Sequence, residues 1–405
     1  MASLHTPIRS TSTAVAPTWW VWLAAWPVTA IFVLSNAATP LYVLWQQGIG
    51  FSKGVMTVVF ASYILGLLGS LLVSGAASDR LGRKAVLLPA LALAVLACVV
   101  FARATSVPAL MAARLFTGIA VGAAVSAGMA AVTDVAGPDR KPLGALLASC
   151  AMVFGAGTGP LLAGVLSEIA PAPTVTVFLV EIVLLISAMI AVARMPIPRP
   201  ERTAAGRWVR IPSVPHAQRR QLVMGVAVFA PGITATSFVL SLGPALLSNL
   251  LGTTSRITAG AMAFAMFLTA TGVQFAVRSL DRRATMIIAA AATTSAMIAL
   301  ILAVHTASVP ALLAVALLAG MGQGLGQLGG LSLLNVNVPT HRLAEANAAL
   351  NVAAYIPAGL LPVSAGYLSD ALGLPTGATL FGMVLLTFAI IGGLAVARLT
   401  HERPH

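Results

Sequence analysis

The sequence Ser106-Val107-Pro108-Ala109-Leu110 recurs unchanged 202 residues later in the chain, at residues 308–312. The same offset brings glycines onto glycines and charged residues onto charged residues. The matched positions are Gly50 and Gly252, Asp79-Arg80 and Asp281-Arg282, Gly118 and Gly320, Gly122 and Gly324, Gly128 and Gly330, Arg140 and Arg342, and residues 163–168 and 365–370. An apolar composition aligns Ala and Leu by chance, but it does not align Gly, Pro and charged residues together. The chain therefore contains an internal repeat.

The composition of the 405-residue chain places it in a membrane. Hydrophobic residues make up 59% of the chain and charged residues only 8%, whereas soluble domains carry about 25% charged residues. So few charges cannot cover a water-exposed surface, which excludes an ordinary soluble enzyme, a secreted disulfide scaffold and a disordered protein. Cys98 and Cys150 both lie in apolar runs, so we expect neither a disulfide nor a metal site.

Twelve apolar runs, each near the ~20 residues that a helix needs to cross a bilayer, predict twelve transmembrane helices. These are Trp20–Trp45, Val55–Gly75, Ala85–Phe101, Val107–Val132, Leu143–Leu166, Thr174–Ala193, Gln221–Leu242, Ile257–Val277, Met286–Val304, Val309–Leu334, Ala346–Gly366 and Thr376–Ala397. The predicted fold class is an all-α integral membrane protein.

The basic residues gather on one side of these spans. Of the 23 Lys and Arg residues, 19 lie on the side that carries both termini, Lys53, Arg103 and Arg256 lie on the other side, and Arg114 lies inside a span. Because positively charged loops stay cytoplasmic, we expect both termini in the cytoplasm and the protein in a bacterial cytoplasmic membrane. The partition accounts for most of the net charge of +13 without a nucleic-acid partner.

The repeat predicts the domain organisation. Each half contains six spans, an even number, so the halves share one topology and are related by an axis along the membrane normal. We predict an N-terminal six-helix bundle at residues 1–193, a cytoplasmic basic linker at 194–220 and a C-terminal six-helix bundle at 221–405. The linker is expected to be a solvated tether on the anionic leaflet rather than a regulatory domain. Two such bundles suit a monomer in the lipid bilayer that rocks around a small-molecule site between them.

The loop after the second span reads Gly75-Ala-Ala-Ser-Asp79-Arg80-Leu-Gly82-Arg83-Lys84. Its glycines permit a tight turn and close helix approach, and its charges can pair within the loop or reach anionic groups. The alternative is a basic loop that only sets topology. The residue order resembles the signature loop of the major facilitator superfamily, and residues 279–283 resemble its degraded second copy. The resemblance implies that Gly75, Asp79, Arg80, Gly82, Arg83 and Lys84 form a conformational latch that joins the two halves on the cytoplasmic side.

Arg114 is the basic residue that lies well inside a span, and its repeat position is Ala316. An intramembrane Arg is costly and is a functional candidate by default. The surrounding pattern, from Leu110 through Gly118 and Gly122, resembles the fourth-helix motif of proton-coupled facilitators, which implies a role for Arg114 in proton transfer. The alternative is a structural ion pair or a clamp on a backbone carbonyl.

In the fifth span, Gly155, Gly159, Pro160 and Gly164 form a pattern of small residues with a helix bend. Small residues at spacing four allow two helices to touch, so plain helix packing is one interpretation. The pattern resembles the antiporter motif of drug–proton exporters, with Ala163 in place of one Gly. The resemblance implies efflux rather than uptake. Many such antiporters carry an acid in the first span, where this chain has Asn36.

Among the ten acidic residues, Glu181 is the one that lies well within a span. Counted from the outer face, Arg114 and Glu181 both lie about seven residues deep, or ~10 Å at ~1.5 Å per residue, so the two could pair. Glu181 is therefore the first candidate proton carrier, and Asp134, at the inner end of the fourth span, is the second. A structural Glu181 that faces outward from a peripheral sixth helix is the alternative. Glu168 and Asp370 are expected at the outer rim.

The resemblance also implies a substrate cavity lined mainly by the first, fourth, seventh and tenth spans. The polar residues that these spans offer are Asn36, Thr39, Tyr42, Thr117, Ser126, Thr234, Ser237, Gln323, Gln327 and Asn335. We therefore predict a secondary active transporter that exports small amphiphilic or drug-like compounds, with the proton gradient as energy source and no cofactor. Efflux or facilitated transport of a polar metabolite such as a sugar is the alternative. An enzyme is not expected, because no intramembrane catalytic cluster, catalytic residue set or metal-ligating set is present in the sequence.

Overall fold

The computed structural model describes residues 17–197, 212–252, 255–339 and 342–399. Every secondary-structure element among them is helical, and twelve helical segments are long and apolar enough to cross a membrane. The predicted fold class and the number of spans are therefore confirmed. Of the predicted linker at 194–220, residues 198–211 lie outside the described residues.

The first six spans follow one another from Thr18 to Arg194. Their elements are α1 (Thr18–Ala37), η1 (Thr39–Leu41), α2 (Tyr42–Trp45), η2 (Gln46–Gly50), α3 (Lys53–Leu81), α4 (Arg83–Ala102), α5 (Val107–Ala123), η3 (Ala124–Gly128), α6 (Met129–Ala136), η4 (Pro138–Arg140), α7 (Lys141–Ile169) and α8 (Pro173–Arg194). The first span comprises α1 to η2 and the fourth comprises α5 to α6.

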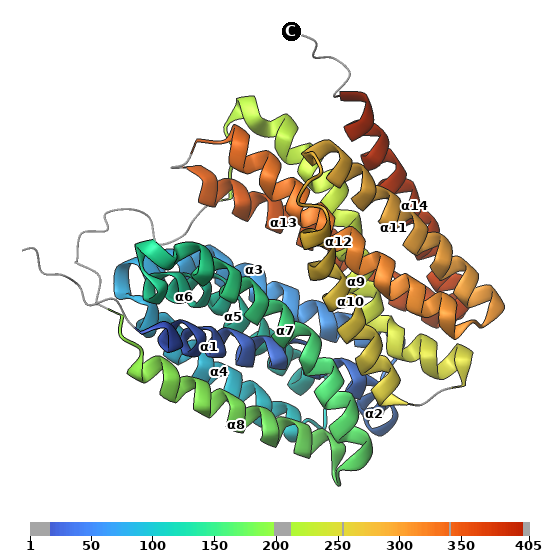
Figure 1. Ribbon diagram of the computed structural model, residues 1–405. Coiled ribbons are helices and arrows are strands. Elements are labelled where there is room, and N and C mark those ends of the chain that lie inside the picture. Colours follow the sequence, from blue (N-terminus) through green and yellow to red (C-terminus); the bar gives the residue numbers. More distant parts are fainter. Residues whose placement is uncertain (1–16, 198–211, 253–254, 340–341, 400–405) are drawn as a thin grey trace, which may run out of the picture.

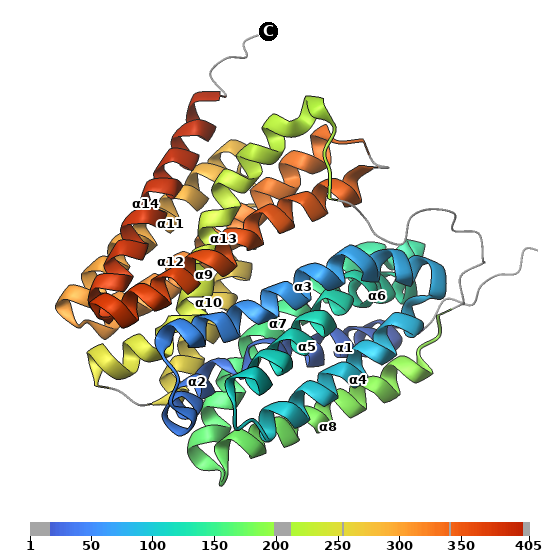
Figure 2. The ribbon, with the colours of Figure 1, turned by 180° about the vertical axis from the view of Figure 1, so that it is seen from behind.

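The last six spans are unbroken helices preceded by one short turn. They are η5 (His216–Gln218), α9 (Arg219–Leu251), α10 (Arg256–Ala276), α11 (Arg282–Thr306), α12 (Val309–Asn337), α13 (Leu343–Leu372) and α14 (Leu374–Leu399). Figures 1 and 2 show α1–α8 and α9–α14 as two groups that approach each other near α2 and the start of α10 and diverge toward α6 and the start of α13. We refer to these groups as the first and second bundle.

The two ends of the molecule differ in charge. Arg83, Lys141 and Arg282 begin helices at the end where the bundles diverge, which we call the basic end. Lys53 and Arg256 begin helices at the opposite end, where the bundles meet, which we call the narrow end.

Several helices extend beyond the predicted apolar runs. The second span was expected to end at Gly75, but α3 continues for six more residues to Leu81. The residues in between include neither Gly nor Pro, and the first residue that stops the helix is Gly82, whose φ of +96° favours glycine. Most of the signature loop is therefore helical, and the turn itself consists of Gly82.

The first and fourth spans, predicted as single helices, are interrupted. In the first span α1 ends at Ala37 and a 3₁₀ turn follows at Thr39–Leu41. Pro40 in this turn has no backbone N–H and therefore interrupts the series of helical hydrogen bonds. In the fourth span η3 is a π-helical segment, a feature that often marks functional sites. An interrupted helix near the middle of a membrane is also the usual framework of a transporter binding site.

The repeat appears as matched helix contacts in the two bundles. A Cβ atom on Gly118 of α5 would collide with the backbone of α3 at Tyr63, and a Cβ atom on Gly320 of α12 would collide with the backbone of α10 at Met266. Glycine is required at both positions because the helix backbones touch there. These repeat-related contacts give both bundles the same internal packing.

Candidate functional site

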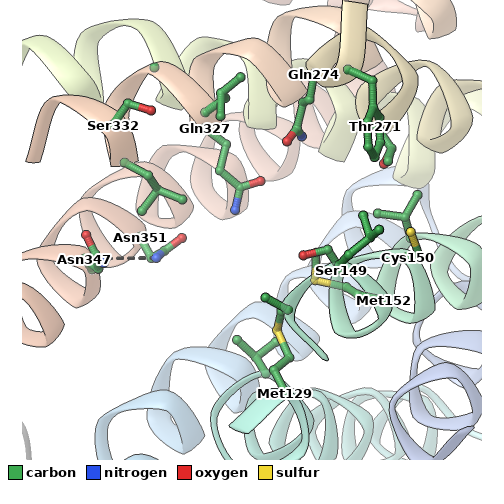
Figure 3. A pocket seen from close by; sticks show the side chains of 18 of the residues that line it. Met129, Ser149, Cys150, Met152, Thr271, Gln274, Gln327, Ser332, Asn347 and Asn351 are labelled. Atoms are coloured by element: carbon green, nitrogen blue, oxygen red, sulfur yellow. Dashed lines mark hydrogen bonds between the residues drawn. The ribbon is translucent and has the colours of Figure 1, made fainter. Parts of the chain in front are cut away.

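A cavity of about 830 Å³ lies between the two bundles. Its walls come from both halves of the chain: Figure 3 shows Met129, Ser149, Cys150 and Met152 of the first bundle opposite Thr271, Gln274, Gln327, Ser332, Asn347 and Asn351 of the second. The lining runs from Tyr63 and Tyr355 to Arg278 and Arg282. Because Arg282 begins α11 at the basic end, the cavity reaches that end of the molecule.

The cavity wall combines apolar side chains with uncharged polar ones. Phe32, Met129, Met152 and Phe275 provide apolar surface, and the amides and hydroxyls provide hydrogen-bonding groups. Among the described residues that line it, none is Asp or Glu, whereas Arg278 and Arg282 are cationic. Such a wall suits an amphiphilic molecule that is neutral or negatively charged.

The narrow end is closed by carboxylates that cap helices of the opposite bundle. Asp370, near the end of α13, accepts the backbone N–H groups of Lys53 at 2.9 Å and Gly54 at 2.8 Å. The next N–H group, that of Val55, is capped locally by the Ser52 hydroxyl, and the regular helical ladder begins with Met56, which donates to the Ser52 carbonyl oxygen. Two of the N–H groups that a helix start leaves unsatisfied are therefore supplied with an acceptor by the second bundle.

The repeat mate of Asp370 makes the reciprocal contact. Glu168, near the end of α7, accepts the backbone N–H of Ile257 and the hydroxyl of Ser255 at the start of α10, both at 3.0 Å. Arg256 also donates from Nη2 to the carbonyl oxygen of Ser167 at 2.7 Å. The two acids expected at the outer rim therefore join the bundles at the end opposite the cavity mouth.

Of the ten predicted cavity residues, Gln327 lines the cavity in this conformation. Asn36, Thr39, Tyr42, Thr117, Thr234 and Ser237 are buried, Ser126 and Gln323 are partly buried, and Asn335 is exposed. Apart from Gln327, the polar residues expected from the first, fourth, seventh and tenth spans do not line the cavity of this conformation, and their role in substrate binding stays a prediction. The residues of the first and seventh spans lie in the parts of those spans toward the narrow end, where the bundles are packed together.

The cavity instead takes most of its polar lining from the second, fifth, eighth and eleventh spans. Tyr63, Ser149, Gln274, Asn347 and Asn351 are the residues that sequence reasoning missed. One signal could have found two of them, because Ser149 and Asn351 occupy equivalent positions in the repeat. Polar residues retained at equivalent positions of both halves are good candidates for a site on the axis between them.

Arg114 is fully buried in α5, and its guanidinium holds the first span at its interruption. Nη1 donates to the carbonyl oxygen of Ser35 at 2.7 Å, while Nε and Nη2 have no hydrogen-bond partner among the described residues. The guanidinium carbon lies 5.7, 5.1 and 5.0 Å from the ring centroids of Tyr42, Phe60 and Tyr63. Arg114 thus acts as a carbonyl clamp inside a ring of aromatic side chains, with two nitrogens left unpaired.

Glu181 is fully buried in α8, so its side chain does not face outward. Neither carboxyl oxygen has a hydrogen-bond partner among the described residues, and α8 packs mainly on α4 and α1. The structure does not bring Glu181 and Arg114 into an ion pair in this conformation. Each is a buried ionisable group that the described residues leave unpaired.

The signature loop forms an ion-pair cluster within the first bundle. Arg83 contacts Asp79 at 2.7 Å and Asp134 at 2.8 Å and also donates to the hydroxyl of Ser78. Lys84 donates to the carbonyl oxygen of Ala193 at the end of α8. Asp134, the second candidate proton carrier, is therefore a partner of Arg83 at the basic end.

The small residues of the fifth span lie at two helix contacts. A Cβ atom on Gly155 or Gly159 would meet the backbone of α1 at Thr29 or Val33. Gly164 meets the backbone of α10 at Arg256, across the bundle interface. Pro160, inside α7, is near Gly260 of α10. The motif thus brings α7 close to α1 on one side and to α10 on the other, next to the Glu168 contact.

Groups for other chemistry are sparse among the residues that the structure describes. No cluster of three or more His, Cys, Asp or Glu side chains there could hold a metal ion. Cys98 is buried, whereas Cys150 is exposed at the cavity wall.

Comparison with known proteins agrees with this architecture. The Major Facilitator Superfamily matches residues 21–362. The 3-(3-hydroxy-phenyl)propionate transporter of Escherichia coli (strain K12) is 37% identical over 110 residues, so the match spans only 27% of this chain and 27% of that transporter.

Solved transporters share the fold at low sequence identity. A POT family transporter in complex with 5-aminolevulinic acid has a TM-score of 0.76 at 12% identity, over 95% of this chain and 96% of its own. A bacterial homologue of the human lysosomal transporter Spinster has a TM-score of 0.73 at 15% identity, over 96% and 98%. The nucleoside transporter NupG has a TM-score of 0.69 at 12% identity, over 96% and 100%.

The family match covers most of the twelve spans, and the cavity between two repeat-related bundles is where a transported small molecule would bind. The protein is a multi-pass membrane transporter rather than an enzyme, and the chain belongs to the Major Facilitator Superfamily.

Proposed function

We propose that the protein is a proton-coupled exporter of small amphiphilic or drug-like compounds that works by alternating access. The observation that carries the proposal is the cavity of about 830 Å³ between two repeat-related bundles, which extends to the basic end while Asp370 and Glu168 join the bundles at the narrow end. Rocking the bundles about this site would open the narrow end and close the basic end.

The distribution of basic residues supports an orientation of the protein in the membrane. Positively charged loops stay in the cytoplasm, so we take the basic end as cytoplasmic and the present conformation as inward-open. In this orientation a compound from the cytoplasm or the inner leaflet would enter between Arg278, Asn347 and Ser149. In this proposal the protein lies in the cytoplasmic membrane, and both of its termini are in the cytoplasm.

The direction of transport rests on the fifth span. The small residues Gly155, Gly159 and Gly164 resemble the antiporter motif of exporters, and they pack α7 against α1 and α10 at the closed end. The apolar wall with a few amides fits amphiphilic compounds. A molecule such as 3-(3-hydroxyphenyl)propionate, the substrate in the name of the Escherichia coli relative, combines an apolar ring with polar groups in this way.

Export or facilitated transport of a polar metabolite such as a sugar is the second candidate. Four side-chain amides line the cavity, at Gln274, Gln327, Asn347 and Asn351, and amides are suited to hydroxyl-rich ligands because each can both donate and accept hydrogen bonds.

Inverted membrane vesicles with an acidic interior provide the test. A panel of labelled amphiphilic compounds and sugars should show accumulation of at least one amphiphile, and a protonophore should abolish that accumulation. Accumulation of a sugar alone would favour the second candidate. Transport that follows only the substrate gradient would contradict proton coupling.

The coupling prediction concerns Glu181, which is buried and unpaired and is therefore a group on which a proton could cross the membrane. Glu181→Gln should lower gradient-driven accumulation by about tenfold or more, while exchange of labelled for unlabelled substrate continues. Asp134→Asn is the parallel variant, because it tests the second candidate proton carrier, whose carboxylate is paired with Arg83. Full gradient-driven accumulation by Glu181→Gln would eliminate Glu181, and full accumulation by both variants would leave a mechanism through Glu168 or Asp370.

A further inference from the structure

Four buried polar atoms without partners gather where the first span is interrupted. They are the hydroxyls of Thr39 and Tyr42 and the Nε and Nη2 atoms of Arg114, and none forms a hydrogen bond with the described residues. Thr39 and Tyr42 follow Ser35, the residue whose carbonyl oxygen binds Arg114, by one and two helical turns. The Tyr42 hydroxyl is close enough to Arg114 to interact with its guanidinium. All four groups can donate a hydrogen bond and the two hydroxyls can also accept one, but none of the four carries a negative charge, so the cluster lacks an anionic acceptor.

The unpaired nitrogens of Arg114 define the shape of the missing acceptor. Nη1 is occupied by Ser35, which leaves Nε and Nη2. These two nitrogens form one edge of the guanidinium, and their parallel N–H bonds match the two oxygens of a carboxylate. Neutral acceptors satisfy such an edge less well than an anion does, because a charge-assisted pair is stronger and its geometry is bidentate.

The charge of this region also requires a counter-ion. Arg114 is fully buried and forms no ion pair with any residue that the structure describes. Three aromatic rings offset part of its charge, but a buried cation without an anion remains unfavourable in a membrane. The repeat-equivalent residue is Ala316, so the fold itself does not need a cation at this place.

The cluster adjoins the cavity through one side chain. Tyr63 lines the cavity, and its ring lies 5.0 Å from the guanidinium carbon of Arg114. Phe32, one turn before the clamped Ser35, lines the cavity as well. Rotation of the Tyr63 ring would open the guanidinium edge to the cavity. Because Arg278 and Arg282 also line the cavity and no acid does, the field within it attracts anions.

We propose that Arg114, with the Tyr42 hydroxyl, binds the carboxylate of a small organic acid whose apolar body lies in the cavity. This inference rests on the proposed function, because it names the substrate class of the same site. The carboxylate would take the Nε–Nη2 edge, and Phe60 and Tyr63 would pack against the adjoining carbon atoms.

The test compares acids with their matched neutral amides on the purified full-length protein. Binding is measured by titration calorimetry for benzoate and benzamide, 3-phenylpropionate and 3-phenylpropanamide, and octanoate and octanamide. At least one acid should bind about tenfold or more tightly than its amide. Equal binding of acid and amide in all three pairs, or binding of neither, would overturn the proposal.

Variants test whether Arg114 causes the preference for acids over their amides. Arg114→Gln should remove the preference for the acid, and Arg114→Lys should keep only part of it, because Lys lacks the two-pronged edge. Tyr42→Phe keeps the ring and should weaken acid binding severalfold without changing amide binding, which provides a readout if Arg114→Gln fails to fold. Arg283→Gln is the matched control, since Arg283 also donates to one carbonyl oxygen, that of Ala397 in α14, and has an unpaired Nε, but it is not among the residues that line the cavity. An equal loss in that variant would contradict a site at Arg114.

Failure of this inference and failure of the proposed function give different results. Gradient-driven export of a neutral compound by the unaltered protein, together with equal binding of acids and their amides, would leave the proposed function intact and eliminate the carboxylate site. Preferential acid binding by a protein that shows no gradient-driven transport would keep the site and remove the proton coupling.

Discussion

Replacing both Glu168 and Asp370 by Ala is expected to move the protein out of the conformation that is open at the basic end, lowering the labelling rate of Cys150 by about tenfold or more. The two carboxylates join the bundles at the narrow end, where each accepts backbone N–H groups at the start of a helix of the opposite bundle. Cys150 reports the change because its thiol lines the cavity.

The expected size of this conformational shift follows from the free energy of helix capping. A side-chain cap at a helix N-terminus contributes about 0.5–2 kcal/mol, and the two contacts together contribute about 1–4 kcal/mol if they break when the narrow end opens. The lower half of this range applies, because both acids are exposed. Ala is used rather than an amide because Asn and Gln can still accept an N–H bond.

The labelling uses a membrane-impermeant maleimide on inverted vesicles. Cys98 is fully buried, so Cys150 is the reporter. Asp281→Ala is the matched control, since Asp281 caps the start of α11 within its own bundle and accepts from Ala284 at 2.7 Å. Unchanged labelling in the double variant would show that the two acids do not bias the conformational equilibrium.

The internal repeat predicts how the effects of the two single variants compare. Glu168 and Asp370 are equivalent residues, and each accepts backbone N–H groups at a helix start of the opposite bundle together with a nearby serine hydroxyl. The contacts lie on different helix pairs, so their free energies should add. Asp370→Ala alone and Glu168→Ala alone are therefore expected to have effects of similar size, each smaller than that of the double variant.

The spans and the repeat were predictable from sequence because they depend on local composition and on comparison of the chain with itself. A run of apolar residues near the length of a bilayer leaves little choice other than a helix. The position of Glu168 and Asp370 at the same end followed from their places in the two halves. That each caps a helix of the opposite bundle did not follow, because the chain places Glu168 and Ile257 far apart.

The cavity residues were harder to predict because one sequence encodes at least two conformations of an alternating-access transporter. Thr234 and Ser237 are buried in the closed half, although they lie on a span that was expected to line the cavity. Ser149 and Asn351 line the open half, although they lie on the fifth and eleventh spans, which were not expected to be the main walls of the cavity. A composition pattern identifies the polar residues of each span but not which of them face the cavity in one state.

Among variants of residues at the basic end, Arg83→Gln is expected to lower the transport rate most, by about tenfold or more. Arg83 is the shared partner of Asp79 and Asp134 and connects the end of α3, the start of α4 and α6. In the variant, the carboxylates of Asp79 and Asp134 lose the cation that they share, and their mutual repulsion disfavours the packed loop. Transport is measured in inverted vesicles at matched protein levels.

Two further variants separate the geometry of this cluster from its charge. Arg83→Lys keeps the charge but lacks the fork that contacts both acids at once, so it should restore only part of the transport. Asp134→Asn added to Arg83→Gln removes one of the two carboxylates that Arg83 contacts and should recover some of the lost rate. If Asp134 acted as the proton carrier, Asp134→Asn alone would abolish gradient-driven transport, and its addition could not rescue Arg83→Gln. Rescue in the double variant would therefore assign Asp134 to the latch and leave Glu181 as the buried acid available for coupling.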